Sequence, residues 1–223
     1  MEERAFAAGM RAAPNYNLGH IDMWSNIDTA YNGYNFRSRL EARWAIFFDY
    51  ANIRYYYEPE AFELPSGRLY LPDFYLPDVY PRWTAGEPGI WVEVKPVYGH
   101  HVYLHELYDM TGIRVALLVG EPRIATSPRL PNTYFVEYEG YEYTEGYDMD
   151  MAFHKCPECG RIAYDYQNRN KCGYCRERGL EVCLDPCHPD LVRASEAARS
   201  WRFDAKSSDR QSPRRAQQWW RRR

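Results

Sequence analysis

Three charged residues interrupt two stretches of the sequence that are otherwise typical of buried strands. Asp73 lies within YLPDFYLP, and Glu93 and Lys95 lie within IWVEVKP. Charges in such positions are costly to bury unless they are paired or bind a metal. Because successive side chains of a strand point to opposite faces, Glu93 and Lys95 share one face. Asp73 could join them from a neighbouring strand.

Two carboxylates beside an ammonium suit a magnesium-dependent reaction at a phosphoryl group. Mg²⁺ usually takes one or two protein carboxylates and leaves its other positions to water and phosphate, where it activates water and neutralises charge. Lys95 is one of four lysines against 24 arginines, which favours a specific need for a compact ammonium. The alternative is an exposed ion pair of Glu93 with Lys95, which contributes little stability and leaves Asp73 unexplained.

The elements that must position these residues can be placed from periodicity. Ser38 and Glu41 form a capping-box signature, and apolar residues then recur at helical spacing, which predicts a helix over 38–51. Glu41 either closes this cap or takes part in catalysis. A second helix is expected to end at Gly112. Strands are expected at 53–64, 67–77, 90–96, 113–120 and 133–140.

The order of these elements, αβββαβ with one further strand, predicts an α/β fold with a mixed central sheet. The ordered residues resemble the PD-(D/E)XK nuclease superfamily, in particular its small phage and bacterial members. The resemblance rests on Pro72-Asp73, on Glu93-Val94-Lys95 and on Glu41 in the preceding helix.

This resemblance implies a restriction-endonuclease-like core with a metal-dependent active site. Asp73, Glu93 and the Val94 carbonyl would ligate Mg²⁺ or Mn²⁺. Lys95 would orient the attacking water or stabilise the transition state. Glu41 would help to bind the metal or to orient water.

Four cysteines form a separate motif downstream. Cys156 and Cys159, and Cys172 and Cys175, are two C-x₂-C pairs separated by twelve residues, a spacing that predicts a four-cysteine structural zinc site. The unit resembles a zinc ribbon, and so small a unit would lack a sufficient core without Zn²⁺.

Further metal-ligating and basic residues surround this motif. Cys183, Cys187 and His188 are either another ligand set or unpaired, and we expect no metal there. The basic residues favour docking of DNA, with a protein–protein contact as the alternative; they are Arg161, Arg169, Lys171, Arg176 and Arg178.

Charge is distributed unevenly along the chain. Residues 1–150 hold 12 Lys and Arg against 22 Asp and Glu, whereas residues 151–223 hold 16 against 9. A basic end on an acidic body can bind polyanions. Its last part mixes arginines with three tryptophans, which suits phosphate neutralisation and base stacking, unless it is a solvated tail with no fixed role. Few aliphatic residues predict that it is disordered alone.

These patterns predict five segments. They are an N-terminal extension (1–30), a nuclease core (31–140), an acidic linker (141–153), a zinc ribbon (154–192) and a basic, disordered tail (193–223).

The leading hypothesis is a magnesium-dependent deoxyribonuclease, an endonuclease that hydrolyses phosphodiester bonds in DNA. The alternative is a catalytically inactive nucleic-acid-binding or assembly protein on a nuclease fold, which the complete set of four site residues disfavours. No apolar run is long enough to span a bilayer, and the start lacks a secretory pattern. We therefore expect a cytoplasmic protein of a bacterium or phage-infected host. A homodimer would supply the two sites that cutting both strands usually needs.

Overall fold

The computed structural model describes residues 27–81, 88–97, 101–123, 133–136, 151–166 and 171–203. Predictions for residues 1–26, 137–150 and 204–223 fall outside this part of the chain. The helices are α1 (Arg39–Tyr50), α2 (Val102–Thr111), α3 (Gly173–Glu177) and α4 (Pro189–Ser200). The strands are β1 (Thr29–Tyr31), β2 (Tyr34–Phe36), β3 (Tyr56–Tyr57), β4 (Phe62–Glu63), β5 (Leu69–Tyr70), β6 (Phe74–Leu76), β7 (Val79–Pro81), β8 (Ile90–Lys95), β9 (Val115–Val119), β10 (Thr133–Val136), β11 (Met151–Lys155) and β12 (Ile162–Tyr166).

A five-stranded mixed sheet forms the centre of the molecule, in the order β10-β9-β8-β6-β3. β8 and β9 run parallel, and the other neighbours are antiparallel. Parallel neighbours need a crossover connection, and α2 provides it between β8 and β9. The predicted mixed α/β architecture is confirmed. The predicted strand 53–64 is divided into β3 and β4, which belong to different sheets, and Glu58 between them has a positive φ of 44°.

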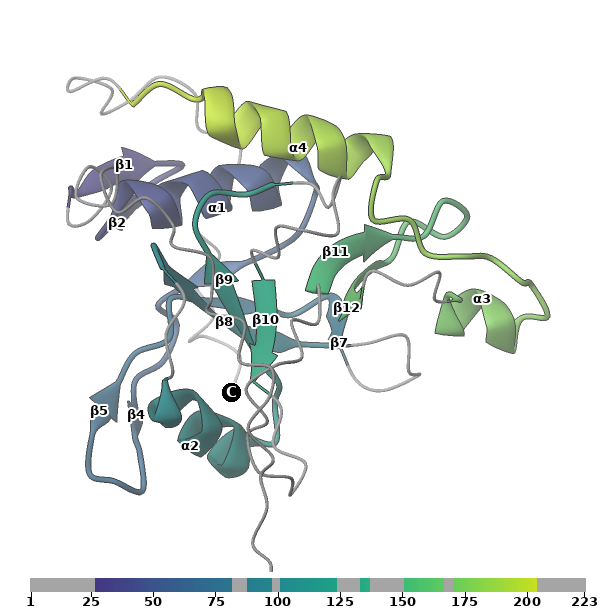
Figure 1. Ribbon diagram of the computed structural model, residues 1–223. Coiled ribbons are helices and arrows are strands. Elements are labelled where there is room, and N and C mark those ends of the chain that lie inside the picture. Colours follow the sequence, from purple (N-terminus) through teal and green to yellow (C-terminus); the bar gives the residue numbers. More distant parts are fainter. Residues whose placement is uncertain are drawn as a thin grey trace, which may run out of the picture.

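Helices cover both faces of this sheet (Figure 1). Val92 and Val94 of β8 pack in one hydrophobic cluster with α1, whereas Trp91, which precedes Val92 and points to the opposite face, packs in a second cluster with Leu104 and Leu107 of α2. Strand alternation thus divides β8 between two cores. In Figure 1, α1 and α4 lie above the sheet and α2 lies below it.

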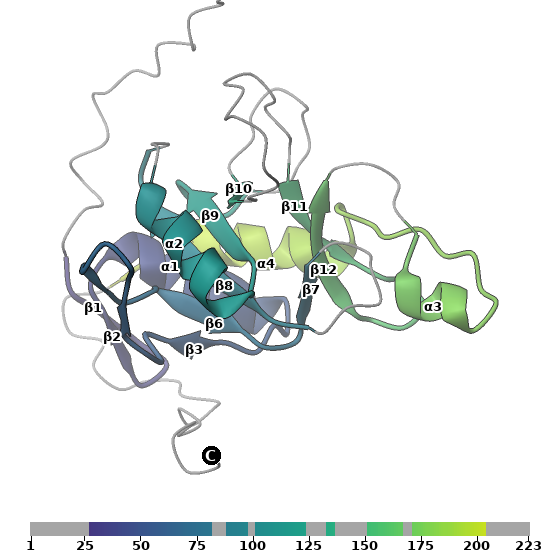
Figure 2. The same ribbon diagram turned by 90° about the horizontal axis from the view of Figure 1, so that it is seen from below.

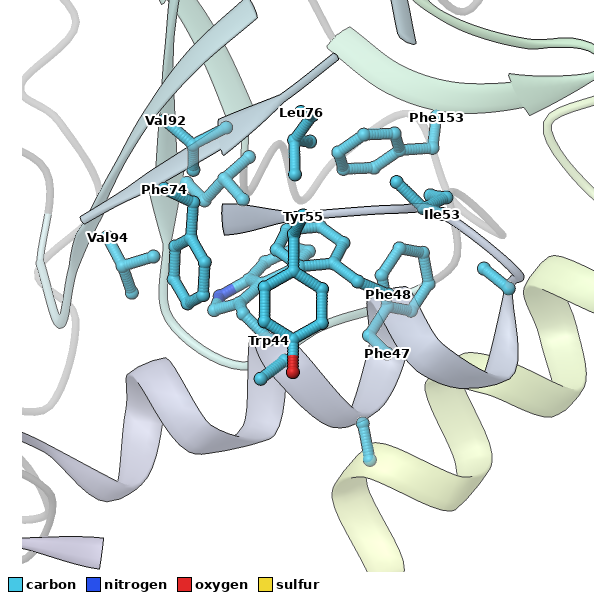
Figure 3. Packing of buried hydrophobic residues seen from close by; sticks show 14 of the residues in the cluster. Trp44, Phe47, Phe48, Ile53, Tyr55, Phe74, Leu76, Val92, Val94 and Phe153 are labelled. Atoms are coloured by element: carbon cyan, nitrogen blue, oxygen red, sulfur yellow. The ribbon is translucent and has the colours of Figure 1, made fainter. Parts of the chain in front are cut away.

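Helix α1 begins where the capping-box signature predicts. Ser38 is the N-cap, and its Oγ accepts a hydrogen bond from the Glu41 N–H at 3.1 Å. The aromatic side chains of Trp44, Phe47 and Phe48 point into the core from α1 toward the sheet (Figure 3). The Trp44 indole N–H also donates to the Gly120 carbonyl at 2.9 Å, which fixes α1 against the end of β9.

The cysteine-bearing unit is continuous with the core, in contrast to the predicted separate module. β12 pairs in parallel with β7, with Ile162 opposite Val79, and β11, β12 and β7 form a three-stranded sheet (Figure 2). Phe153 and Tyr164 from this sheet belong to the same hydrophobic cluster as α1. Residues 151–153, predicted as linker, lie in β11.

The predicted tail boundary at residue 193 is wrong, because it falls inside α4. Leu191, Ala194 and Ala198 are fully buried in the cluster that also contains α1. Most of this stripe is alanine. The disorder prediction was based on the scarcity of larger aliphatic residues, and it therefore missed a helix that packs through small side chains. The guanidinium of Arg43 in α1 donates to the carbonyls of Ala198 and Arg199 and so satisfies the C-terminal end of α4.

None of the helices in the described part of the chain is long and apolar enough to cross a membrane.

Two truncations distinguish the packed helix from the segment beyond it. A chain that ends at residue 203 keeps every described residue, and its free energy of unfolding should stay within about 0.5 kcal/mol of wild type. A chain that ends at residue 192 loses the buried stripe of α4, and we expect a loss of roughly 3 kcal/mol or more. Urea denaturation followed by circular dichroism measures both. Equal stability of the two truncations would contradict the packing role of α4.

Candidate active site and metal centre

Two buried carboxylates face each other where β6 begins. In the antiparallel register Phe74 is opposite Val92, so Asp73, one residue before Phe74, lies across from Glu93. Asp73 and Glu93 are each only 3% exposed. Burial of two acids side by side is costly unless each is neutralised or hydrogen-bonded, and both carboxylates have such partners.

Asp73 is held between the start of α1 and the backbone of β8. Its Oδ1 accepts from the Arg37 guanidinium at 2.9 Å, and its Oδ2 accepts from the Val94 N–H at 2.8 Å. Pairing of β6 with β8 stops at Val92, so the Asp73 side chain takes the place of a strand partner for Val94. N–H and C=O groups of one strand residue point to the same side, which directs the Val94 carbonyl toward this edge too.

Glu93 is held by a second cation and by two tyrosines. Its Oε1 pairs with the Lys95 ammonium, and its Oε2 accepts from the buried Tyr70 hydroxyl at 2.6 Å. The Tyr103 hydroxyl of α2 donates to Oε1 at 3.3 Å. The shared face predicted for Glu93 and Lys95 therefore brings the two side chains into contact. The Lys95 side chain remains 31% exposed, so its ammonium is at the boundary with solvent.

The closeness of the acids is reflected in the pKa of Asp73. Burial raises the pKa of Asp73 well above its usual range, and the carboxylates of Glu93 and Glu41 raise it further, against the opposite effects of Lys95 and the Val94 N–H. Burial and the Glu93 carboxylate likewise raise the pKa of Tyr70 well above its usual range, so its hydroxyl remains a donor. A group of negative charges that raises a neighbour's pKa is also a group that would be stabilised by a cation.

Glu41 takes part in capping the N-terminus of α1. Its Oε1 accepts from the Ser38 hydroxyl at 2.8 Å, and its Oε2 accepts from the Arg37 N–H at 3.1 Å and the Tyr57 hydroxyl at 2.7 Å. The capping alternative thus has direct geometric support. Glu41 is close enough to act on the charge of Asp73, and its role in catalysis stays a prediction.

Several residues of this site carry no recognisable motif in the sequence. Arg37 pairs with Asp73 and also, through Nε, with Glu58 Oε1 at 2.5 Å. Glu58 thus lies beside the candidate site, and it adopts a left-handed backbone conformation, φ 44°. Tyr70 and Tyr103 are two of 21 tyrosines, and only the alternation of the strand preceding Asp73 could have indicated that Tyr70 points inward.

Four cysteines form a compact group in the segment 156–175. Cys156 and Cys175 have their Sγ atoms 3.7 Å apart, and Cys159 and Cys172 have theirs 3.6 Å apart. All four sulfurs lie within 4.8 Å of one another. A tetrahedral ion with Zn–S bonds of about 2.3 Å places its sulfurs about 3.8 Å apart, so the geometry fits zinc.

The local backbone explains how the cysteines converge. Gly160, at φ 71°, allows the tight turn after the first pair, and the Cys159 N–H approaches the Cys156 sulfur at 3.5 Å. The second pair is at the start of α3, where the Cys172 N–H bonds to the Val182 carbonyl at 2.8 Å. Cys183 is exposed and not part of the four-sulfur group.

Among the described residues, these cysteines are the only group of three or more His, Cys, Asp or Glu side chains compact enough to hold one ion. Glu41, Asp73 and Glu93 do not form such a group, so a cation at the acidic site would rest on the Asp73–Glu93 pair. Comparisons with protein-family models, with curated proteins and with solved structures find no match for the chain. The site must therefore be judged from its own geometry.

The zinc prediction is one ion per chain, bound through the four cysteines. Cys172→Ser should lose the ion and lower the melting temperature, because one ligand and the local fold depend on each other. Cys183→Ser is the matched control, since it changes an exposed cysteine nearby and should keep both. Elemental analysis of the purified proteins, with thermal denaturation, measures the result. Absence of zinc from the wild-type protein would refute the site.

Proposed function

We propose that the protein is a metal-dependent deoxyribonuclease whose active site is formed by Asp73, Glu93 and Lys95. The observation that carries the proposal is the buried pair of facing carboxylates, Asp73 and Glu93, with the Lys95 ammonium at its edge. Structural ion pairs do not need two acids packed together in this way. Two carboxylates so close that one raises the pKa of the other, as Glu93 does for Asp73, suit a divalent cation.

The residues present fit a hard divalent ion such as Mg²⁺ or Mn²⁺. Asp73 and Glu93 would hold it, together with the Val94 carbonyl that is directed toward the same strand edge. When bound, such an ion supplies charge neutralisation and an acidified water for attack on phosphorus.

The chain's own groups can be assigned narrower tasks. Tyr70 and Tyr103 orient the Glu93 carboxylate through their hydroxyls. The Val94 N–H fixes the Asp73 carboxylate. Lys95, partly exposed beside Glu93, is placed to donate to an attacking water or to the negative charge that develops on the phosphoryl oxygens.

DNA is the proposed substrate because basic and aromatic groups accompany this acidic site. The Arg161 guanidinium lies 3.5 Å from the centre of the Tyr174 ring next to the zinc site and donates to the Tyr80 hydroxyl at 2.6 Å. Arg176 and Arg178 are exposed on the same unit. Such groups suit phosphate neutralisation, and the arginine-rich segment after residue 203 adds to them.

Substitutions at the site should separate metal binding from catalysis. Asp73→Ala and Glu93→Ala should lower the cleavage rate on the order of 10²–10³-fold or more and abolish any rise of melting temperature with Mg²⁺. Lys95→Ala should lower cleavage comparably while the Mg²⁺-dependent rise persists. Lys95→Arg should not restore activity, because a planar guanidinium cannot replace a compact ammonium. Cleavage of linear, circular and branched DNA, with Mg²⁺, Mn²⁺ or chelator, measures activity.

Two controls make this test decisive. Asp78→Asn changes an exposed acid that pairs with Arg54, and it should leave both cleavage and the Mg²⁺ response unchanged. Glu41→Ala must be judged beside its stability, since loss of the cap alone costs about 1 kcal/mol. Full activity in Asp73→Ala or Glu93→Ala would refute the proposed active site.

The segment beyond residue 203 should contribute affinity rather than chemistry. A chain that ends at residue 203 should bind DNA more weakly, with a shallower dependence of log K on log salt, because fewer counterions are released. Its cleavage rate at saturating DNA and low salt should be retained. Fluorescence anisotropy at several salt concentrations measures the slope, and an unchanged slope would show that this segment does not contact phosphates.

A further inference from the structure

We propose that Arg37 is a phosphate-binding residue of the candidate active site, holding a phosphate group of the DNA strand beside the bond that is cut. The proposal rests on the proposed nuclease function and adds a substrate contact to it. Nothing in the metal-binding motif requires an arginine at this position.

The charge balance of the site calls for such a residue. Four acids lie in and beside the candidate site, namely Glu41, Glu58, Asp73 and Glu93. The last three form ion pairs with Arg37 or Lys95. A phosphodiester carries negative charge and is repelled by these acids. Its approach therefore depends on cations at the edge of the site, and Arg37 and Lys95 are in that position.

Arg37 is the more accessible of the two cations. Its side chain is 56% exposed, compared with 31% for Lys95. A guanidinium has five N–H donors in a planar fork. The ion pairs with Glu58 and Asp73 use Nε and Nη2, and this planar fork matches the bidentate geometry of a phosphate.

The position of the guanidinium is also fixed from several sides. The backbone N–H of Arg37 bonds to the Glu41 carboxylate, which holds the main chain from which the side chain extends. The guanidinium itself pairs with Glu58 through Nε and with Asp73 through Nη2. Glu58 keeps an unfavourable left-handed conformation, and its own N–H bonds to the Asp73 carbonyl at 2.9 Å. Backbone strain of this kind is unfavourable and concentrates at functional sites. At Glu58 this conformation accompanies a carboxylate that pairs with Arg37, the residue that also pairs with Asp73.

A purely structural arginine would be only the counter-ion of Asp73, and the two roles predict different measurements. Duplex binding in the presence of chelator isolates phosphate contacts from metal-dependent cleavage. For Arg37→Ala we expect the slope of log K against log salt to decrease in magnitude by about 0.9, the value for one phosphate contact, and the Kd at low salt to rise about tenfold. Arg37→Lys should restore the slope but only part of the affinity, since it keeps the charge and loses the fork.

Arg54→Ala is the matched control. Arg54 is 48% exposed and pairs with an acid, Asp78, at 2.5 Å, so the substitution removes a similar surface ion pair away from the acidic group. It should leave both the slope and the Kd at wild-type values. Thermal denaturation of each variant shows whether it is folded.

The outcomes separate this inference from the proposed function. A reduced slope in Arg37→Ala but not in Arg54→Ala supports the phosphate contact, even where the wild-type protein cuts none of the DNA forms and the nuclease proposal fails. A wild-type slope and Kd in Arg37→Ala overturn the inference, even where the wild-type protein is an active nuclease. Failure of the wild-type protein to bind DNA at all overturns both.

Discussion

The repulsion between two buried carboxylates, Asp73 and Glu93, is the constraint around which the centre of this protein is arranged. Each acid is almost completely removed from water, and the presence of the other raises the proton affinity of Asp73. The surrounding groups offset this cost from four directions: a guanidinium, an ammonium, a backbone N–H and tyrosine hydroxyls. Apolar residues of similar volume would avoid this cost, and the burial of both acids therefore supports the proposed active site.

The elements around the pair are positioned by apolar packing on both faces of the sheet. α1 is fixed through its aromatic side chains and through the Trp44 hydrogen bond to Gly120. The Gly120 N–H bonds in turn to the Lys95 carbonyl at 2.8 Å, so the helix and the end of β8 are tied to the same residue. Arg37 reaches Asp73 because α1 begins beside β6. On the opposite face, α2 brings Tyr103 to Glu93.

Local signals allowed α1, the second helix, the strands of the central sheet and the cysteine group to be predicted, because capping, alternation and C-x₂-C spacing are local properties. β1, β2, β7, β11 and β12 were not predicted, and the predicted strand 67–77 is divided into β5 and β6. The predicted stop of α2 at Gly112 is confirmed by its left-handed φ of 66°. The pairing of β12 with β7 joins residues about eighty positions apart, and no local pattern encodes it. α4 was not predicted, because its buried stripe consists mostly of small residues. The roles of Arg37 and Tyr70 depend on the register between strands, which composition does not reveal.

The pairing of β7 with β12 also changes how the zinc site relates to the acids. β7 follows β6 by two residues, and its Val79 carbonyl accepts from the Gly89 N–H just before β8 begins. β6 and β8 are the strands that carry Asp73 and Glu93. The four cysteines lie in the segments before and after β12, and β12 pairs with β7. A disturbance of the cysteines therefore has a direct hydrogen-bonded route to the strands of the acidic site, and the cysteine-bearing unit acts as part of the scaffold of that site as well as a surface beside it.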